Sequence, residues 1–291
     1  MRILIFGRTG QVARELARMK WDSDVLIAQL SRADCDLAEL QAVRRALAER
    51  RPDIVINAAA YTAVDRAESE ESIVRQINAE APRVLAEECQ RSGSALIHLS
   101  TDYVFGGEKM GAYLESDEPD PHTVYGRTKA VGESAVRDAL PNHVILRTSW
   151  VFSAHGSNFV KTMLRLSGAR SEVDVVADQH GAPTSARDVA KAVRIIAVAM
   201  GRGRGAWGTF HFAGTPPTTW HCFARSIFEV AGKNVVVTPV SSAQYPTVAR
   251  RPSNSILDCG KILTTYGIKQ PSWHKALVET VSELRSRDSC R

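Results

Sequence analysis

The sequence lacks an apolar stretch long enough to cross a membrane. A membrane-spanning helix needs about 20 consecutive apolar residues, whereas the longest apolar stretch, residues 189–200, contains Lys191 and Arg194. The apolar run at the N-terminus, residues 1–6, ends at Gly7 and is too short to be the core of a secretory signal peptide. We therefore expect no contact with a membrane and a cytoplasmic location.

Cysteine is also scarce. The 291 residues include five cysteines, and no two of them have Cys-x-x-Cys spacing: Cys35, Cys89, Cys222, Cys259 and Cys290. The odd number and the spacing argue against a disulfide framework and against a zinc site. A reducing compartment fits this pattern.

Long blocks of one charge are absent as well. The chain has 37 Lys and Arg residues against 32 Asp and Glu residues, a formal net charge of +5. The basic residues are scattered, so no nucleic-acid partner is expected. The small positive excess suits an anionic ligand such as a nucleotide diphosphate, and suits a solvated basic surface equally well.

The first half of the sequence contains short apolar runs that alternate with longer amphipathic ones. The apolar runs predict strands at residues 2–6, 25–30, 53–57, 95–99 and 143–148. The amphipathic runs predict helices at residues 11–19, 38–50, 69–92 and 116–139. Strands and helices that alternate in this way predict an α/β fold with a Rossmann-type, doubly wound parallel sheet.

The alternation changes after Trp150. Residues 158–167, 185–200, 219–231 and 273–287 have helical patterns, and residues 235–240 read as a strand. We interpret residues 1–150 as mainly one domain. Residues 151–291 then form mainly a smaller, interleaved α/β domain that covers the carboxyl edge of the sheet, with some segments that return to the first domain.

A glycine motif follows the first predicted strand and opens the first predicted helix. Its spacing is Gly-x-x-Gly-x-x-Ala, with Gly7 at the turn and Ala13 in the last position. Gly10 allows the backbone to approach a pyrophosphate, whose charge is favoured at the N-terminus of the helix. An ordinary strand–helix turn is the alternative, but the strand and helix around the motif favour a dinucleotide. The predicted cofactor loop comprises Gly7, Thr9, Gly10, Gln11 and Val12.

The end of the second predicted strand bears on the choice of cofactor. In dinucleotide-binding folds this point faces the adenosine ribose, where a hydroxyl or basic residue accommodates a 2'-phosphate. Ser31 and Arg32 occupy it, which favours NADPH and leaves NADH as an alternative. Asp36 and Leu37 follow, close enough to contact the adenine. Arg32 as a simple surface arginine fits the sequence about equally well.

Tyr125 and Lys129 are four residues apart within a predicted helix, and therefore share one of its faces. A lysine ammonium one turn away stabilises tyrosinate and lowers the tyrosine pKa from its reference near 10. Tyr125 would then serve as a general acid near neutral pH. The spacing alone also occurs in many helices whose two residues are merely exposed.

Two further segments support the catalytic interpretation. Thr101 and Ser100 follow the fourth predicted strand, where a hydroxyl can bind the carbonyl of a substrate. The third strand ends in small residues that let a cofactor lie against the backbone: Ala58, Ala59 and Ala60. Together with the glycine loop, these features predict a reductase that uses NADPH or NADH.

The same segments resemble those of the extended short-chain dehydrogenase/reductases. Within that superfamily the sequence is similar to the dTDP-4-dehydrorhamnose reductases. The segments that carry the closer similarity are residues 7–11, 57–68, 100–105, 147–152, 178–184 and 251–255. These segments run through nearly the whole chain.

The resemblance implies a reaction. A hydride from the cofactor would reduce the 4-keto group of dTDP-4-dehydro-β-L-rhamnose and give dTDP-L-rhamnose. Tyr125 would donate the proton, Lys129 would tune Tyr125 and hold the nicotinamide ribose, and Thr101 would orient the carbonyl. Lys129 and Tyr125 would thus also contact the cofactor.

The resemblance also implies a substrate pocket. By motif position, Asp102, Tyr103 and Trp150 would line the sugar, although Trp150 fits core packing too. Arg251 would neutralise the diphosphate. Pro252 favours an extended backbone at Arg251, so the neighbouring Arg250 should point the other way.

Some members of the family bind a divalent cation through glutamates at a dimer contact. Glu15 is present, but Arg187 and Asp188 stand in the helix where a second glutamate would be needed. We therefore expect no metal, and we expect Glu15 to be a solvated residue of the first helix. A homodimer is compatible with the resemblance, and the sequence does not fix the oligomer.

Three other functions share this fold. A dTDP-sugar 4,6-dehydratase needs a second carboxylate after Asp102, and Tyr103 stands there instead. An epimerase of nucleotide sugars needs only a retained cofactor, so it stays open. A regulatory subunit like that of methionine adenosyltransferase would bind NADP without catalysis, but the intact set of Thr101, Tyr125 and Lys129 speaks against it.

Overall fold

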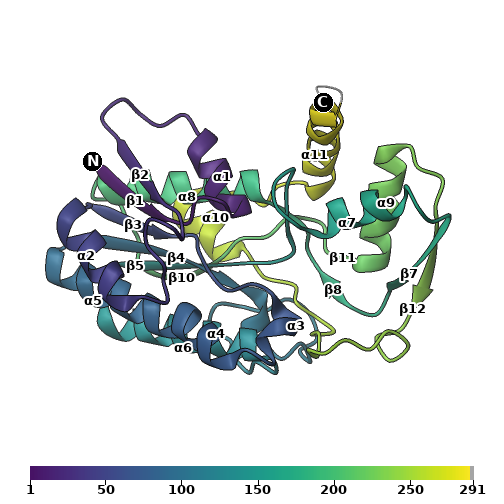
Figure 1. Ribbon diagram of the computed structural model, residues 1–291, viewed down its shortest axis with the longest axis horizontal. Helices are drawn as coiled ribbons and strands as arrows, with labels where there is room; N and C mark the ends of the chain where they lie inside the picture. The colour runs from purple at the N-terminus through teal and green to yellow at the C-terminus, as the bar shows by residue number, and fades with distance from the viewer. Residues whose placement is uncertain (289–291) are drawn as a thin grey trace.

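The computed structural model describes residues 1–288. Its centre is a parallel sheet of six strands in the order β10-β5-β4-β3-β1-β2 (Figure 1). The strands are β1 (Arg2–Phe6), β2 (Leu26–Leu30), β3 (Ile54–Asn57), β4 (Ala95–Thr101), β5 (His143–Thr148) and β10 (Gly208–His211). The predicted doubly wound sheet is confirmed, and β10 is a sixth strand that the sequence did not predict.

Helices cover both faces of the sheet (Figure 1). One face carries α1 (Gln11–Arg18), α8 (Ala186–Gly201) and α10 (Gly260–Tyr266). The other carries α2 (Leu40–Arg50), α4 (Glu71–Arg75), a π-helix η1 (Gln76–Glu80), α5 (Ala81–Ser92) and α6 (Val124–Ala139). Because both faces are covered, β3 and β5 are buried along their whole length.

The order of the strands reverses beside β1, which has β2 on one side and β3 on the other. In an open parallel sheet, ligands bind at such a switch point, outside the carboxyl ends of the strands. The loops that begin at Gly7 and Ala58 leave β1 and β3 at this point. The topology therefore places the predicted cofactor loop at the ligand crevice.

A smaller unit lies at one end of the sheet and is drawn on the right of Figure 1. It contains α7 (Phe159–Leu166), β7 (Glu172–Val176), α9 (Trp220–Ala231), β12 (Val236–Val240) and α11 (Trp273–Asp288). Two-residue strands connect it to the sheet: β6 (Val151–Phe152), β8 (His180–Gly181), β9 (Thr184–Ser185) and β11 (Thr218–Thr219). β7 and β12 pair in parallel over an apolar core that includes Phe223 and Trp273. We keep a division near residue 150 as a proposal.

The helix predicted over residues 116–139 begins only at Val124, so that prediction was wrong at its start. Pro119 and Pro121 precede it, and proline restricts the residue before it to an extended backbone. The hydroxyl of Thr123 then accepts a hydrogen bond from the amide of Gly126 at 2.9 Å. This N-cap fixes the start of α6 immediately before Tyr125.

Glu15 is buried, so the expectation that it is solvated was also wrong. Only 3% of its surface is exposed, and its carboxylate lies 3.0 Å from Nε2 of His155 and 3.8 Å from Nε of Arg187. Arg18, one turn along α1, pairs with Glu283 of α11 at 2.7 Å. The cause is tertiary: α1 packs on α8 while α11 closes over its end, and a sequence pattern does not show this.

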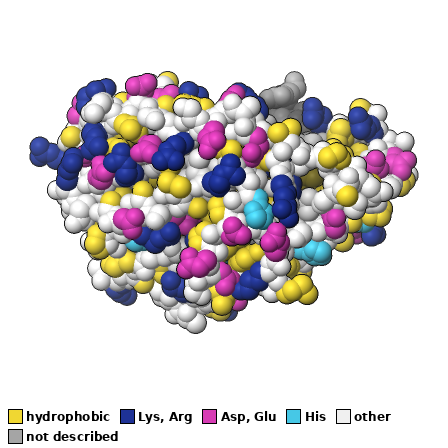
Figure 2. Space-filling view, turned by 90° about the horizontal axis from the view of Figure 1, so that it is seen from below, with side chains coloured by type: hydrophobic (Ala, Val, Ile, Leu, Met, Phe, Trp, Pro, Cys, Tyr) yellow, Lys and Arg dark blue, Asp and Glu magenta, His cyan; other side chains and the backbone are white. Residues whose placement is uncertain are grey.

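The four cysteines among the described residues, Cys35, Cys89, Cys222 and Cys259, are free thiols, and Cys290 lies outside the described range. No helix within residues 1–288 is both long and apolar enough to span a bilayer. Basic and acidic side chains are mixed on the face in Figure 2.

Close packing between α6 and the π-helix η1 fixes the position of the loop that follows β3. Gly132 of α6 faces the backbone of Asn78, and a Cβ at that position would overlap the Asn78 carbonyl oxygen. The Asn78 side chain accepts from the amide of Tyr61 at 2.9 Å and donates to the carbonyl of Tyr61 at 3.0 Å. Gly132 thus allows the approach that fixes the loop after β3.

Gly132→Ala is expected to lower the free energy of unfolding by about 1–3 kcal/mol, because the added methyl overpacks this contact. The opposite sign holds for most helices, where alanine is favoured over glycine by about 0.5–1 kcal/mol. Urea unfolding measures the difference. Ser134→Ala, at an exposed position of α6, is the control and should change the value by less than about 0.5 kcal/mol. An unchanged midpoint for Gly132→Ala would contradict the close packing.

Candidate active site

The predicted cofactor loop has the shape that a pyrophosphate requires. Gly7 has φ +108°, and a Cβ there would lie 3.1 Å from the carbonyl oxygen of Ala58. Gly10 caps α1, and no side chain bonds to the amides of the first helical turn. Those amides remain available to an anion at the positive end of the helix. The loop therefore fits a dinucleotide cofactor.

Three residues predicted to contact the cofactor have side chains committed elsewhere. The Gln11 amide oxygen accepts from Ser153 at 2.8 Å and from Asn158 at 2.9 Å, which ties the cofactor loop to the smaller unit. Val12 and Leu37 are buried in the hydrophobic core.

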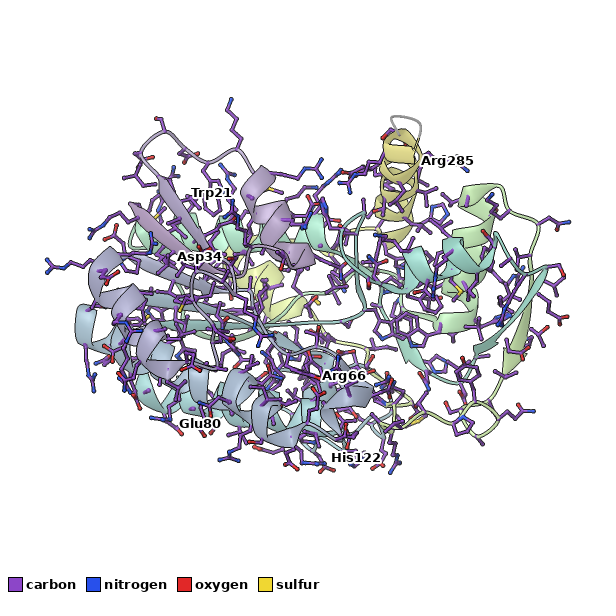
Figure 3. The ribbon with its side chains drawn as sticks, viewed as in Figure 1. Trp21, Asp34, Arg66, Glu80, His122 and Arg285 are labelled. Atoms are coloured by element: carbon purple, nitrogen blue, oxygen red, sulfur yellow. The ribbon has the colours of Figure 1, made fainter. Side chains whose placement is uncertain are left out.

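Carboxylates already pair with the two residues predicted to face the adenosine ribose, Ser31 and Arg32. The amide and hydroxyl of Ser31 both donate to Asp34, at 2.8 and 2.7 Å, and Figure 3 labels Asp34 on the loop after β2. These hydrogen bonds, with the positive charge of Arg8, hold the Asp34 pKa below its usual value. Arg32 donates to Asp36 at 2.8 Å from a mostly exposed position. Asp34 and Arg8 were not among the residues predicted from the sequence.

The structure brings Thr101 and Tyr125 together behind the crevice. The hydroxyl of Thr101 donates to Oδ1 of Asp102 at 2.9 Å and accepts from the amide of Tyr103 at 3.1 Å. The rings of Tyr103 and Tyr125 meet edge to face, with centroids 5.6 Å apart. Burial raises the pKa of Tyr125, and a hydrogen bond with Thr101 opposes that rise. Tyr125 is therefore a protonated phenol at neutral pH.

Lys129 is buried below Tyr125, with 2% of its surface exposed. Its Nζ lies 2.7 Å from the carbonyl oxygen of Leu99 and 3.1 Å from Nε2 of His98. Burial lowers the pKa of Lys129 to about 8, and the charge of Glu133 opposes this. No hydrogen bond joins Lys129 to Tyr125 within residues 1–288. Lys129 is not among the groups that shift the Tyr125 pKa, which burial raises, so the expected lowering by the lysine is not seen in this structure.

A buried ion pair lies behind Lys129. Arg147 of β5 contacts Glu133 of α6 through Nη2 at 2.6 Å and Nε at 2.9 Å, and Nη1 lies 3.3 Å from Nε2 of His211. Burial alone would raise the pKa of Glu133, but the hydrogen bonds and charge of Arg147, together with Ser100 and the charge of Arg137, outweigh burial and lower it. The sequence offered a signal that was not used, since Arg147 is a charged residue inside a predicted buried strand.

The two neighbouring arginines before Pro252 point in different directions. Arg251 donates to Asp65 at 2.6 Å, and its guanidinium lies 5.9 Å from the ring centroid of Tyr103. Arg250 is exposed and pairs with Glu108 at 3.1 Å. A cavity of about 420 Å³ adjoins both, between the loops at residues 178–179 and 242–253. In Figure 3, Arg66 marks the helix α3 (Val64–Ala67) that carries Asp65.

Trp150 is held in a strained conformation at the edge of the site. Its φ of +46° lies in the left-handed region, which is a genuine outlier for a bulky residue. Its ring stacks on Trp220 with centroids 3.6 Å apart, and Gly181 leaves room for it on the other side. Trp220 was not predicted. Strain of this kind persists only where the surroundings fix it, and it is common at functional sites.

Comparison with known proteins decides the family. A family model described as the RmlD substrate binding domain matches residues 1–286. The dTDP-4-dehydrorhamnose reductase of Sinorhizobium fredii is 45% identical over 282 residues, which cover 95% of each protein. The chain belongs to the dTDP-4-dehydrorhamnose reductase family.

Two further proteins are similar to this chain over nearly its full length. The crystal structure of the reductase from Bacillus anthracis in complex with NADP has a TM-score of 0.89 and 36% identity, and covers 97% of this chain and 99% of that one. A probable dTDP-4,6-dihydroxy-2-methyloxan-3-one 4-ketoreductase from Streptomyces antibioticus is 41% identical, covering 98% and 96%. The resemblance and the fold class predicted from the sequence are confirmed.

Asp102, beside Thr101, is an almost fully buried acid, with 2% of its surface exposed. Burial raises its pKa to about 6, against hydrogen bonds from Ser255 and Thr101 that lower it. Because the folded protein holds this proton more tightly than the unfolded chain does, ionisation of Asp102 costs stability. The cost begins as the pH rises above about 4 and is complete above about 6.

Asp102→Asn should therefore stabilise the protein above pH 6. A pKa of about 6 in place of 3.8 corresponds to at most about 3 kcal/mol, and asparagine keeps the acceptor for Thr101. Thermal unfolding at pH 8 and pH 4 tests this, with the gain expected only at pH 8. Asp138→Asn, exposed on α6, is the control. Equal effects of Asp102→Asn at both pH values would exclude ionisation as the cause.

Proposed function

We propose that this protein reduces the 4-keto group of dTDP-4-dehydro-β-L-rhamnose and forms dTDP-L-rhamnose. The observation that carries the proposal is the set of buried Thr101 and Lys129 with the partly buried Tyr125, at the same edge of the sheet as the loop at Gly7. The loop offers backbone amides to a dinucleotide, and this set offers a proton at the same crevice. Family membership supports the choice of substrate.

NADPH, when bound against Gly7, Gly10 and Ala58, supplies the hydride. The chain's own part is to place a proton at the carbonyl oxygen and to exclude water. Tyr125 suits this part because burial keeps its phenol protonated until the oxygen develops negative charge. Thr101 would donate to the same oxygen when its proton turns away from Oδ1 of Asp102, to which it donates in this structure.

For the cofactor we propose a preference for NADPH. Ser31 and Arg32 supply the donors that a 2'-phosphate needs, and the charge of Arg8 acts in the same region. Asp34 and Asp36 pair with these donors in the structure, so a phosphate has to displace carboxylates. A ribose hydroxyl bonds to Asp34 without any displacement, which keeps NADH as the alternative.

For the diphosphate of the substrate we propose Arg251. Its side chain is 20% exposed, whereas that of Arg250 is 69% exposed. Nη1 of Arg251 is buried and makes no hydrogen bond of normal geometry within residues 1–288. An unused donor of this kind is costly unless a ligand accepts from it. The planar guanidinium also matches phosphate oxygens.

Elimination by a 4,6-dehydratase would need a second carboxylate directly after Asp102, and none stands there. Tyr103 occupies that position, with its ring against Tyr125 and near the Arg251 guanidinium. Burial raises the pKa of Tyr103 to about 12, so it does not serve as a base at neutral pH. These contacts support reduction over dehydration.

Tyr125→Phe tests the proton donor. The variant should oxidise NADPH with dTDP-4-dehydrorhamnose about 10²–10⁴-fold more slowly, because the general acid is lost. The dissociation constant for NADPH should stay near the parent value. Tyr266→Phe, which removes a distant hydroxyl bonded to Ala206, is the control and should retain turnover. Near-parental turnover in Tyr125→Phe would refute the assignment, and absence of turnover in the parent protein would refute the proposed reaction.

Arg251→Ala tests the diphosphate site, with Arg250→Ala as its matched neighbour. Loss of a charged hydrogen bond of about 1.5–3 kcal/mol should raise the Michaelis constant for the dTDP-sugar roughly 10- to 100-fold. The dissociation constant for NADPH should not change, since Arg251 lies on the other side of the crevice. If Arg250→Ala alone has the effect, the wrong arginine was chosen. If neither has it, the diphosphate is bound elsewhere.

A further inference from the structure

A row of buried polar side chains runs from the loop after β3 to Lys129. Nδ2 of Asn57 lies 3.1 Å from Nδ1 of His98, and Nε2 of His98 lies 3.1 Å from Nζ of Lys129. Asn57, His98 and Lys129 are 1%, 0% and 2% exposed. The predicted reaction uses only the lysine, so the other two residues need an explanation.

The backbone at one end of the row fixes the direction of its hydrogen bonds. The amide of Ala59 donates to Oδ1 of Asn57 at 3.2 Å. A backbone amide can only donate, so the Asn57 oxygen must face it and Nδ2 must face the histidine. Nδ1 of His98 is then an acceptor. In a neutral ring the single proton therefore lies on Nε2, and burial lowers the His98 pKa well below its usual value.

The proton on Nε2 points at Lys129. An ammonium group has three donors and no acceptor, so it cannot receive this hydrogen bond. A neutral amine can, and it can still donate to the carbonyl oxygen of Leu99 at 2.7 Å. We infer that His98 is a positioning residue that stabilises the neutral amine form of Lys129 in the cofactor-free protein, with Asn57 setting the tautomer of His98.

The charges around Lys129 agree with a neutral amine. Burial lowers the Lys129 pKa to about 8, and Glu133 on the same helix is the one charge that raises it. The carboxylate of Glu133 is already engaged by Arg147 of β5 and by Arg137 of α6. From the other elements packed around this region, His143 of β5 acts on His98 and Asp102 of η2 (Asp102–Val104) acts on Tyr125.

The neutral amine has a consequence for the proposed reaction, on which this step rests. Without an ammonium beside it, Tyr125 stays a phenol, so its proton is kept for the substrate. An anionic cofactor favours the charged form of Lys129. Binding of NADPH above about pH 8 should then transfer one proton from the buffer to Nζ.

NMR of the ligand-free protein tests the inference directly. With ¹⁵N-labelled histidine, the His98 signals, assigned by their loss in His98→Gln, should show a protonated Nε2 and an unprotonated Nδ1 above about pH 8, where Lys129 is neutral. With ¹³C-labelled lysine, Lys129 should titrate near pH 8. A protonated Nδ1, or a Lys129 midpoint near the reference value of about 10.4, would overturn the inference. Neither the His98 tautomer nor the Lys129 titration depends on turnover. Failure of this inference can therefore be told apart from failure of the proposed reaction.

Asn57→Asp should reverse the direction of the hydrogen bonds in this row while keeping a side chain of the same shape. A carboxylate accepts both from the Ala59 amide and from a proton on Nδ1 of His98, so Nε2 becomes an acceptor for an ammonium. The His98 tautomer should switch, and the Lys129 midpoint should rise by about one pH unit or more. Calorimetry at pH 9 in two buffers should find about one proton taken up with NADPH by the parent protein and about half a proton or less by the variant. An unchanged tautomer in a folded variant contradicts the inference, and if the variant does not fold, the parent spectra still decide it.

Discussion

The buried ion pair between Arg147 and Glu133 is the interaction on which the active site depends. It joins β5 to α6 through two nitrogens of one guanidinium, Nε and Nη2, and both side chains are buried. Removing one partner of such a pair costs about 3–5 kcal/mol, because an uncompensated charge stays buried. Glu133 lies one turn after Lys129 and two turns after Tyr125. The ion pair therefore sets the depth and rotation at which α6 presents both residues to the end of β4.

Burial at that depth acts on every titratable group of the site in the same direction, towards the neutral form. It raises the pKa of Tyr125 and of Asp102, and it lowers the pKa of Lys129. Burial thus keeps the proton of Tyr125 in place, where a reduction needs it. Expectations drawn from spacing alone missed this, because the distance of four residues along a helix carries no information about how far the helix is from water.

The sequence was informative where local patterns determine the structure. The strands from β1 to β5, the turn at Gly7 and the i, i+4 pair of Tyr125 and Lys129 all follow from periodicity and from glycine. It was uninformative where distant segments meet. β10 is four residues long and follows a segment rich in glycine and arginine, so only its pairing with β5 makes it a strand. The burial of Glu15 depends on α11, more than 250 residues further along the chain.

The cations proposed for phosphates share one property that shapes how ligands bind. Arg32 pairs with Asp36, and Arg251 pairs with Asp65. A phosphate that arrives therefore replaces or shares a carboxylate, and the free energy gained is the difference between two ionic contacts. The carboxylates also keep both guanidinium groups in place before binding, so less side-chain entropy is lost when the ligand arrives. Because Asp65 belongs to α3 and Arg251 to the loop from the smaller unit, the second pair also ties these two parts of the molecule together.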